Sequence, residues 1–224
     1  MSYKSNHYAL VGGNIVDVID GKIISGHSLV IKNGIINDIC KDKDLKNNIP
    51  QILINGRYIT PGLIDCHAHC FVGQFGDRGN VMPSEMTARA GQHLEGMLQR
   101  GFTTVRDAGG ADSGHRSAVE KGLFPGPRLF VSGKILSQTG GHGDQRAIAD
   151  VCGCESVAGG MSVIADGVDA VRKAVRENVR QGVDQIKIMG GGGVASPGDK
   201  LVHPQYSLEE IEAIVDEANR CGRY

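Results

Sequence analysis

The sequence lacks an excess of charge of either sign, and it lacks long apolar runs. Its 24 basic and 25 acidic residues give a net charge of -1 and a pI near 6.7, which offers no electrostatic attraction to nucleic acid or to an anionic membrane. No apolar run approaches the roughly 20 residues that a transmembrane helix needs. The amino terminus, Met1 to Tyr8, lacks the apolar centre of a signal peptide. These absences favour a cytoplasmic protein that binds neither nucleic acid nor membrane.

Cysteine is too sparse for a disulfide scaffold. The six cysteines are scattered along 224 residues, which suits a reducing compartment. Cys152-Gly153-Cys154 resembles a ligand pair, but its spacing is not that of common zinc motifs. A loop that carries two thiols is the preferred interpretation.

The apolar pattern divides the chain near residue 60. Residues 1–59 contain short β-rich runs, separated by Asp20-Gly21, Asn33-Gly34 and Asn55-Gly56. Asp-Gly and Asn-Gly are strong hairpin signals. We therefore predict a small antiparallel, sandwich-like β domain whose strands fall within 9–18, 22–25, 29–32, 35–40 and 51–54.

Residues 60–224 alternate strands with amphipathic helices, which is typical of βα units around a parallel sheet. Four such units are half of the eight that close a (β/α)8 barrel, a fold of about 250 residues. The predicted fold class is therefore α/β, the first half of a TIM-type barrel preceded by the small β domain. Strands are expected at 63–69, 103–107, 128–132 and 185–189, and helices at 84–100, 166–180 and 207–221.

Three explanations fit an incomplete barrel. The chain is a fragment of a longer enzyme, or its second half is another polypeptide or symmetry mate, or it is a truncated relative that has lost catalysis. The first is preferred. In every case the open sheet edges and the uncovered apolar face of a half-barrel favour association, most simply as a homo-oligomer.

His67 and His69 are the clearest candidates for metal ligands. They stand two residues apart at the end of a short apolar run, and residues two apart on a strand share a face. Both imidazoles can therefore reach one cation. A structural zinc site that adds Cys66 and Cys70 is less favoured, because alternation turns both cysteines to the opposite face.

Lys187 is the second chemical candidate, at the end of the apolar strand predicted for 185–189. An unpaired ammonium is costly in a barrel interior, which favours the neutral amine. On the residues alone, a salt-bridged lysine at the strand end is the stronger alternative. The glycines that follow, 190–193, lack the Gly-Lys-Ser/Thr ending of a phosphate loop. They are interpreted as a flexible active-site loop that lets substrate approach the metals closely.

His142 lies among glycines in the loop after the third predicted strand, where its imidazole is expected to be exposed. A surface histidine without a role is the alternative. Asp107, at the tip of the second strand, is expected to support the site through hydrogen bonds.

Four segments together resemble the amidohydrolase superfamily. Within it they look like the branch of imidazolonepropionase-like enzymes and of prolidase-type metal-dependent dipeptidases or carboxypeptidases. The order and spacing of all four match, and they cover nearly the whole chain. The segments are 61–69, 103–110, 137–144 and 185–193.

The resemblance implies roles for the candidate residues. His67 and His69 would hold the more buried metal, and the Lys187 amine would add carbon dioxide to give a carbamate that bridges two divalent cations. His142 would contact the substrate. Two further histidines and a proton-handling aspartate would follow residue 224. Imidazole and carboxylate-like ligands favour zinc, in one or two copies per site, without excluding manganese, iron or cobalt.

The resemblance also implies an activity: metal-dependent hydrolysis of an amide C–N bond by metal-activated water, in a dipeptide or N-acyl amino acid. A cyclic amide such as an imidazolone is the alternative substrate. An alternative of another class is a catalytically idle half-barrel that acts only by association.

Overall fold

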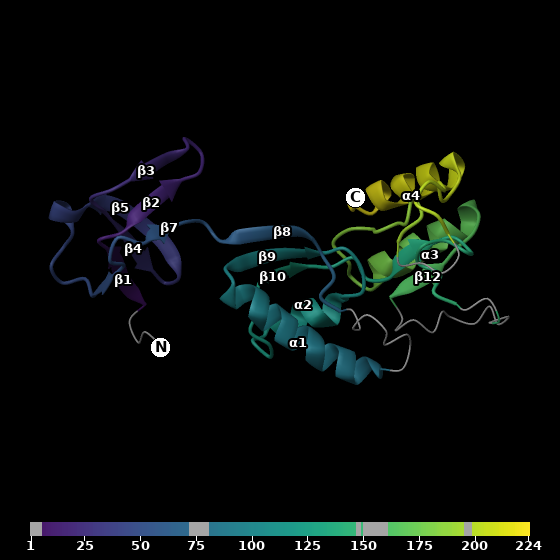
Figure 1. The fold of residues 1–224 in the computed structure, drawn as a ribbon, viewed down its shortest axis with the longest axis horizontal. Coiled ribbons are helices and arrows are strands. Elements are labelled where there is room, and N and C mark those ends of the chain that lie inside the picture. The colour runs from purple at the N-terminus through teal and green to yellow at the C-terminus, as the bar shows by residue number, and fades with distance from the viewer. Residues whose placement is uncertain (1–5, 72–80, 147–148, 150–160, 195–198) are drawn as a thin grey trace. The chain divides into compact units, whose positions relative to one another are not determined.

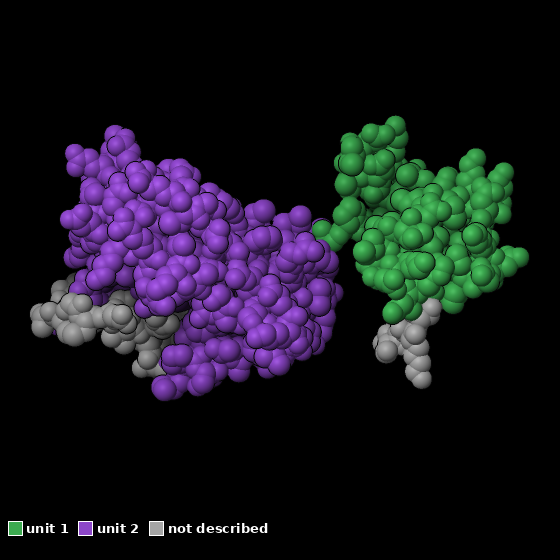
Figure 2. Space-filling model, turned by 180° about the vertical axis from the view of Figure 1, so that it is seen from behind, with its two compact units in different colours: residues 1–62 green, residues 63–224 purple. Residues whose placement is uncertain are grey.

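The computed structural model describes residues 6–71, 81–146, 149, 161–194 and 199–224. The chain divides into two compact units, Met1–Gly62 and Leu63–Tyr224 (Figure 2). Cys152 and Cys154 lie outside the described residues. Among the described residues, no helix is both long enough and apolar enough to cross a membrane.

The first unit contains two small sheets. The larger has the strand order β5-β4-β1-β6 and the smaller the order β3-β2-β7. Ala9, Val11, Val30 and Ile49 form its buried core. The elements are β1 (His7–Val11), β2 (Asn14–Asp17), β3 (Lys22–Ile24), β4 (His27–Lys32), β5 (Ile35–Lys41), the short 3-10 helix η1 (Asp42–Asp44), β6 (Gln51–Leu53) and β7 (Tyr58–Ile59).

Two of the three predicted turns join antiparallel strands. Asn33 and Gly34 have φ values of 53° and 76° between β4 and β5, as a tight hairpin turn requires. Asp20-Gly21 likewise joins β2 to β3. The expectation of a wholly antiparallel sheet is wrong, because β6 runs parallel to β1 and β7 parallel to β2. The physical reason is the Asn55-Gly56 turn, which passes the chain from one sheet to the other instead of folding it back.

The second unit begins with a parallel sheet of order β10-β9-β8. Its strands are β8 (Leu63–Ala68), β9 (Phe102–Asp107) and β10 (Arg128–Phe130). Helices α1 (Pro83–Gln99) and α2 (Ser113–Glu120) lie on one side of this sheet (Figure 1). The α1 residues Met86, Ala90 and Leu94, spaced four apart, pack on Val105. Full burial of a Met or Leu side chain contributes about 1.5–3 kcal/mol to the stability of the fold.

The rest of the second unit is built around the parallel pair β11 (Ile135–Ser137) and β12 (Ser162–Ile164). Helices α3 (Val168–Arg180) and α4 (Leu208–Arg220) pack on each other and share a core with Leu136. The predicted capping box at the start of α4 is confirmed: the Ser207 N–H donates to Glu210 Oε2 over 2.7 Å, and the Glu210 N–H donates to Ser207 Oγ over 3.3 Å.

The predicted strand at 185–189 is wrong as a regular strand, because only Ile188 forms an isolated parallel bridge, to Leu136. The segment still occupies a strand position. The Leu136 N–H donates to the Lys187 carbonyl (2.9 Å), and the Ile186 N–H donates to the Tyr224 carbonyl (2.7 Å). The segment that carries Lys187 therefore lies between Leu136 of β11 and Tyr224.

Candidate metal centre and substrate loop

The structure brings His67 and His69 together at the carboxyl end of β8. Both are exposed, and their ring centroids lie 5.4 Å apart with the planes at 68°. The His69 Nδ1 lies 3.1 Å from the Gly109 carbonyl oxygen. Because a carbonyl only accepts, Nδ1 carries the proton and Nε2 keeps its lone pair for a cation.

The electrostatic setting of His67 also suits a ligand. Burial first, and then the charges of Lys187 and His69, lower the pKa of His67. A lowered pKa favours the neutral imidazole, which is the form that binds metal. Lys187 itself is half-buried, and its charge is the second cause, after burial, of the lowered pKa of His67.

Asp107 supports this end of the sheet, as predicted. It is fully buried at the end of β9. Its Oδ2 accepts from the Cys70 N–H (2.6 Å), and its Oδ1 accepts from the N–H groups of Gly109 (2.9 Å) and Ala111 (3.1 Å). Burial raises the pKa of Asp107, while these three donors favour its charged form. The carboxylate thus holds Gly109, whose carbonyl in turn orients the His69 ring.

Gly109 cannot carry a side chain. Its φ is 148°, and a Cβ there would overlap the side chain of Ile135. The glycine therefore permits the close approach of β11 to the turn that orients His69.

The two nearby cysteines do not form a zinc site with the histidines. Cys66 is exposed and Cys70 is buried, and both are free. Burial and the Asp107 carboxylate raise the pKa of Cys70, which opposes the thiolate that zinc requires. Among the described residues, no group of three or more His, Cys, Asp or Glu residues could hold a metal ion. A carbamate on Lys187 is not one of these ligand types.

His142 lies in the loop after β11 and is half-buried. Its imidazole packs against Gly193, where a Cβ would overlap the ring. At this position the glycine run makes room for a histidine, whereas the sequence had suggested room for substrate. The run thus connects His142 to the segment that carries Lys187.

Two buried glutamines were missed by the sequence reasoning. The Gln185 Nε2 donates to the Asp107 carbonyl over 2.9 Å, and the Gln205 Oε1 accepts from the His142 N–H over 2.9 Å. The only signal in the sequence was a polar residue within an apolar stretch, and many surface positions share that signal.

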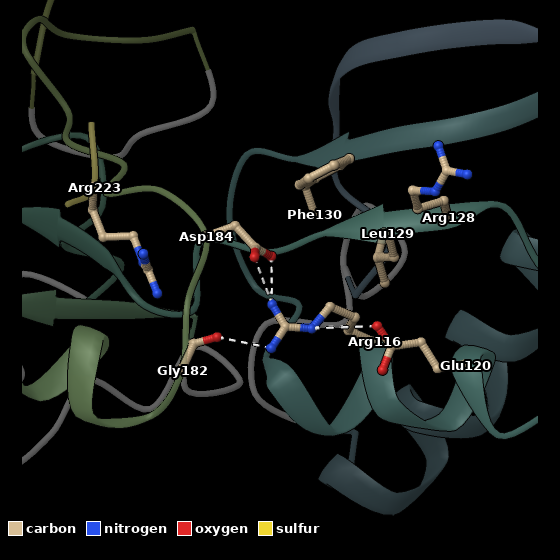
Figure 3. Close-up of a pocket in the computed structure, with 8 residues that line it drawn as sticks. All are labelled: Arg116, Glu120, Arg128, Leu129, Phe130, Gly182, Asp184 and Arg223. Atoms are coloured by element: carbon tan, nitrogen blue, oxygen red, sulfur yellow. Dashed lines mark hydrogen bonds and ion pairs between the residues drawn. The ribbon is translucent and has the colours of Figure 1, made fainter.

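A pocket of about 440 Å³ lies elsewhere, beside β10 and α2 (Figure 3). The Arg116 Nη1 donates to both carboxylate oxygens of Asp184 at 2.7 Å, and its Nη2 donates to the Gly182 carbonyl at 3.1 Å. The lining takes in the whole of β10, Arg128 to Phe130, and includes none of His67, His142 and Lys187. Because Arg116 and Asp184 are already paired with each other in its lining, we assign this pocket to structural ion pairing. Its lining residues are Arg116, Glu120, Arg128, Leu129, Phe130, Gly182, Asp184 and Arg223.

Comparison with known proteins gives matches over nearly the whole chain. Residues 58–224 match the Amidohydrolase family, and residues 7–59 match the NagA composite domain. The ochratoxinase of Aspergillus niger is 34% identical over 222 residues, which cover 91% of this chain and 46% of the ochratoxinase.

Two solved structures resemble the chain closely. A prolidase complexed with N-methylphosphonate-L-proline is 43% identical with a TM-score of 0.90, and the match covers 97% of this chain and 55% of that one. A Xaa-Pro dipeptidase with methionine in its active site is 30% identical with a TM-score of 0.85, again over 97% and 55% of the two chains. The chain thus spans about half the length of these relatives. The likeness confirms the predicted fold class, a partial TIM-type barrel preceded by a small β domain.

Proposed function

The chain belongs to the amidohydrolase family, and from this premise we propose that it supplies the first metal ligands of an enzyme that hydrolyses an amide bond with metal-activated water. The observation that carries the proposal is the pair formed by His67 and His69 at the carboxyl end of β8, with ring centroids 5.4 Å apart. The hydrogen bond from His69 Nδ1 to Gly109 supports it, because it leaves Nε2 available to a cation.

The proposed cofactor is one or two divalent cations. Zinc is favoured, since imidazole and carboxylate-like oxygen are its common ligands. When bound, such a cation supplies a water of lowered pKa and a Lewis acid for the amide carbonyl. His67 and His69 would hold it through imidazole nitrogens.

Lys187 is proposed to add a third ligand as a carbamate. Its neutral amine nitrogen forms a bond to the carbon of carbon dioxide and releases one proton, which leaves a carboxylate-like group on the side chain. The electrostatic influence of Lys187 on His67, whose pKa it helps to lower, supports this role. A proton-handling aspartate and two more histidines are expected beyond residue 224.

His142 is proposed to bind the substrate by donating a hydrogen bond to the oxygen of the scissile carbonyl. Negative charge develops on that oxygen during attack by water, and a preorganised donor there lowers the barrier. Support comes from its half-buried setting beside Gly193, which restricts the orientation of its ring.

The proposed substrate class is a dipeptide or an N-acyl amino acid. The prolidase and the Xaa-Pro dipeptidase among the similar structures make dipeptides that end in proline the first substrates to test. A cyclic amide is the alternative within the same reaction type.

The test is hydrolysis by the complete polypeptide. A panel of Xaa-Pro dipeptides, N-acyl amino acids and cyclic amides is assayed with the wild type, with His67→Ala and with the control His93→Ala. His93 is also exposed but lies on α1. We expect His67→Ala to abolish hydrolysis without unfolding the protein, and His93→Ala to remain active. Wild-type turnover by His67→Ala would sink the assignment.

A further inference from the structure

The loop that carries His142, residues 138–145, is held by hydrogen bonds along most of its backbone. Every backbone N–H from Thr139 to Asp144 has an acceptor, so no donor in this stretch depends on water. The acceptors, in chain order, are Asp166 Oδ1 (2.9 Å), Asp144 Oδ2 (2.9 Å), the Gln138 carbonyl (3.0 Å), Gln205 Oε1 (2.9 Å), Ser137 Oγ (3.0 Å) and the Gly141 carbonyl (2.9 Å).

Gln205 supplies the acceptor for His142 itself. It stands 63 residues further along the chain and is 2% exposed. Its side-chain amide has a defined orientation, because Nε2 donates to Asp199 Oδ2 at 2.5 Å while Oε1 accepts from His142. A buried amide with both ends bonded holds its partners in one geometry.

A second glutamine makes the reciprocal contact. Gln138, within the His142 loop, accepts from the Tyr206 N–H at 2.5 Å through its Oε1. Tyr206 is buried and has a φ of 62°, a conformation that a bulky residue adopts only when its surroundings hold it there. The loop and the segment before α4 are thus tied by two glutamine side chains that point in opposite directions.

The same segment also holds the glycine run. The Gly192 N–H donates to the His203 carbonyl at 3.0 Å, and the Gln205 N–H donates to the Gly190 carbonyl at 3.1 Å. The run in turn presents Gly193 to the imidazole of His142. Gln205 therefore bonds to the backbone of His142 through its side chain, and to Gly190 in the segment after Lys187 through its own N–H.

We propose that Gln205 is a positioning residue, which sets the place of the His142 imidazole relative to Lys187 by holding the His142 backbone. The proposal rests on the proposed function, in which His142 binds the scissile carbonyl. A misplacement of about 1 Å in such a group costs on the order of 100-fold in rate.

The test uses two changes in the complete polypeptide. Gln205→Leu keeps the size of the side chain but removes both hydrogen bonds. The double variant Gln205→Glu with Asp199→Asn makes both hydrogen bonds again. One glutamate oxygen accepts from the His142 N–H, and the other accepts from the asparagine NH2, so that position 199 becomes the donor. Asp199→Asn alone is the matched control, because its oxygen still accepts from Gln205.

Two readouts are measured: kcat and KM for the best substrate of the panel, and the hydrogen-exchange protection of the His142 amide. We expect Gln205→Leu to lower kcat roughly 10- to 100-fold with little change in KM, and to speed exchange at His142. The double variant is expected to recover both quantities, which a general loss of stability would not do.

Wild-type kcat in Gln205→Leu, or lost kcat with unchanged protection of His142, would overturn the inference. If Gln205→Leu fails to fold, failure of the double variant to recover protection would do the same. Failure of the proposed function looks different: no substrate is hydrolysed, or His142→Ala leaves turnover intact. The exchange measurement then decides by itself whether Gln205 holds His142.

Discussion

At the scale of single residues, Asp107 organises more of the site than its position beside the histidines suggests. One carboxylate accepts three backbone N–H groups, from the turn after β8 and the turn after β9. Only a residue with two acceptor oxygens and no donor satisfies all three. The orientation of His69 through Gly109 is therefore secured by the Asp107 carboxylate.

We expect Asp107→Asn to weaken both the fold and the metal site. The asparagine NH2 would face an N–H donor in a buried place, which costs about 1–3 kcal/mol, and a disturbed Gly109 carbonyl would reduce metal affinity roughly 10- to 100-fold. Denaturant unfolding and metal titration measure the two effects. Asp169→Asn, at an exposed position of α3, is the control. Unchanged metal affinity in Asp107→Asn would confine Asp107 to stabilising the fold.

Asp144 gives a prediction for pH. Arg146 is the main cause that holds the pKa of Asp144 at about 2, below its ordinary 3.8, through contacts of 2.7 and 2.5 Å. A depressed carboxyl pKa stabilises the fold above the unfolded pKa, and this contribution is lost as pH falls through the folded pKa. Relative to Asp144→Asn, the wild type should lose up to about 2 kcal/mol between about pH 5 and pH 2. Parallel denaturation curves for the two proteins would contradict this.

At the scale of elements, the sequence predicted those helices and strands that have a regular apolar period or clear end signals. β8, β9, α1 and α4 have regular patterns or clear end signals, and each was predicted to within a few residues. α2 was not assigned, because it has only eight residues and its capping box is formed by Asp112 and His115 in place of the usual Ser or Thr with Glu. β11 and β12 have three residues each, too few for a period to be read.

In the candidate site too, features with a local sequence signal were predicted and features without one were not. The pairing of His67 with His69 follows from the two-residue repeat of a strand, which is a local property. The contacts of Gln205 with His142, and of His142 with Gly193, join segments separated by about 50 to 60 residues. Nothing in the local pattern of either segment encodes them, so only the folded structure shows them.

The glycine run gives a prediction at this scale. A Cβ at Gly193 would overlap the His142 ring, whereas a Cβ at Gly190 meets nothing within 4 Å. We expect Gly193→Ala to displace His142 and lower kcat/KM roughly 10- to 100-fold, and Gly190→Ala to remain close to the wild type. Equal activity of the two variants would show that the position of His142 does not matter for turnover.

At the scale of the whole molecule, β8 forms an edge of the three-stranded sheet, among the residues that the structure describes. Its Leu63 and Ile64 are 50% and 65% exposed. An apolar parallel edge favours pairing with another strand. We therefore expect residues 1–224, expressed alone, to associate, and native mass spectrometry measures the copy number. Ile64→Lys should weaken this association, and Ile19→Lys, at a residue 92% exposed in a turn of the first unit, should not.

Measurement of the metal content distinguishes a working site from an idle one. The described chain supplies only two imidazoles and Lys187 as candidate ligands. Its His, Cys, Asp and Glu residues include no group of three that could hold a cation, so the three protein ligands that are usual for a catalytic zinc are reached only when Lys187 carries its carbamate. Residues 1–224 alone should therefore lose their metal to a mild chelator, while the complete polypeptide should keep one or two divalent cations. Retention of metal by residues 1–224 in the His67→Ala background would place the ligands elsewhere, and a metal-free but active complete polypeptide would remove the cation from the proposed reaction.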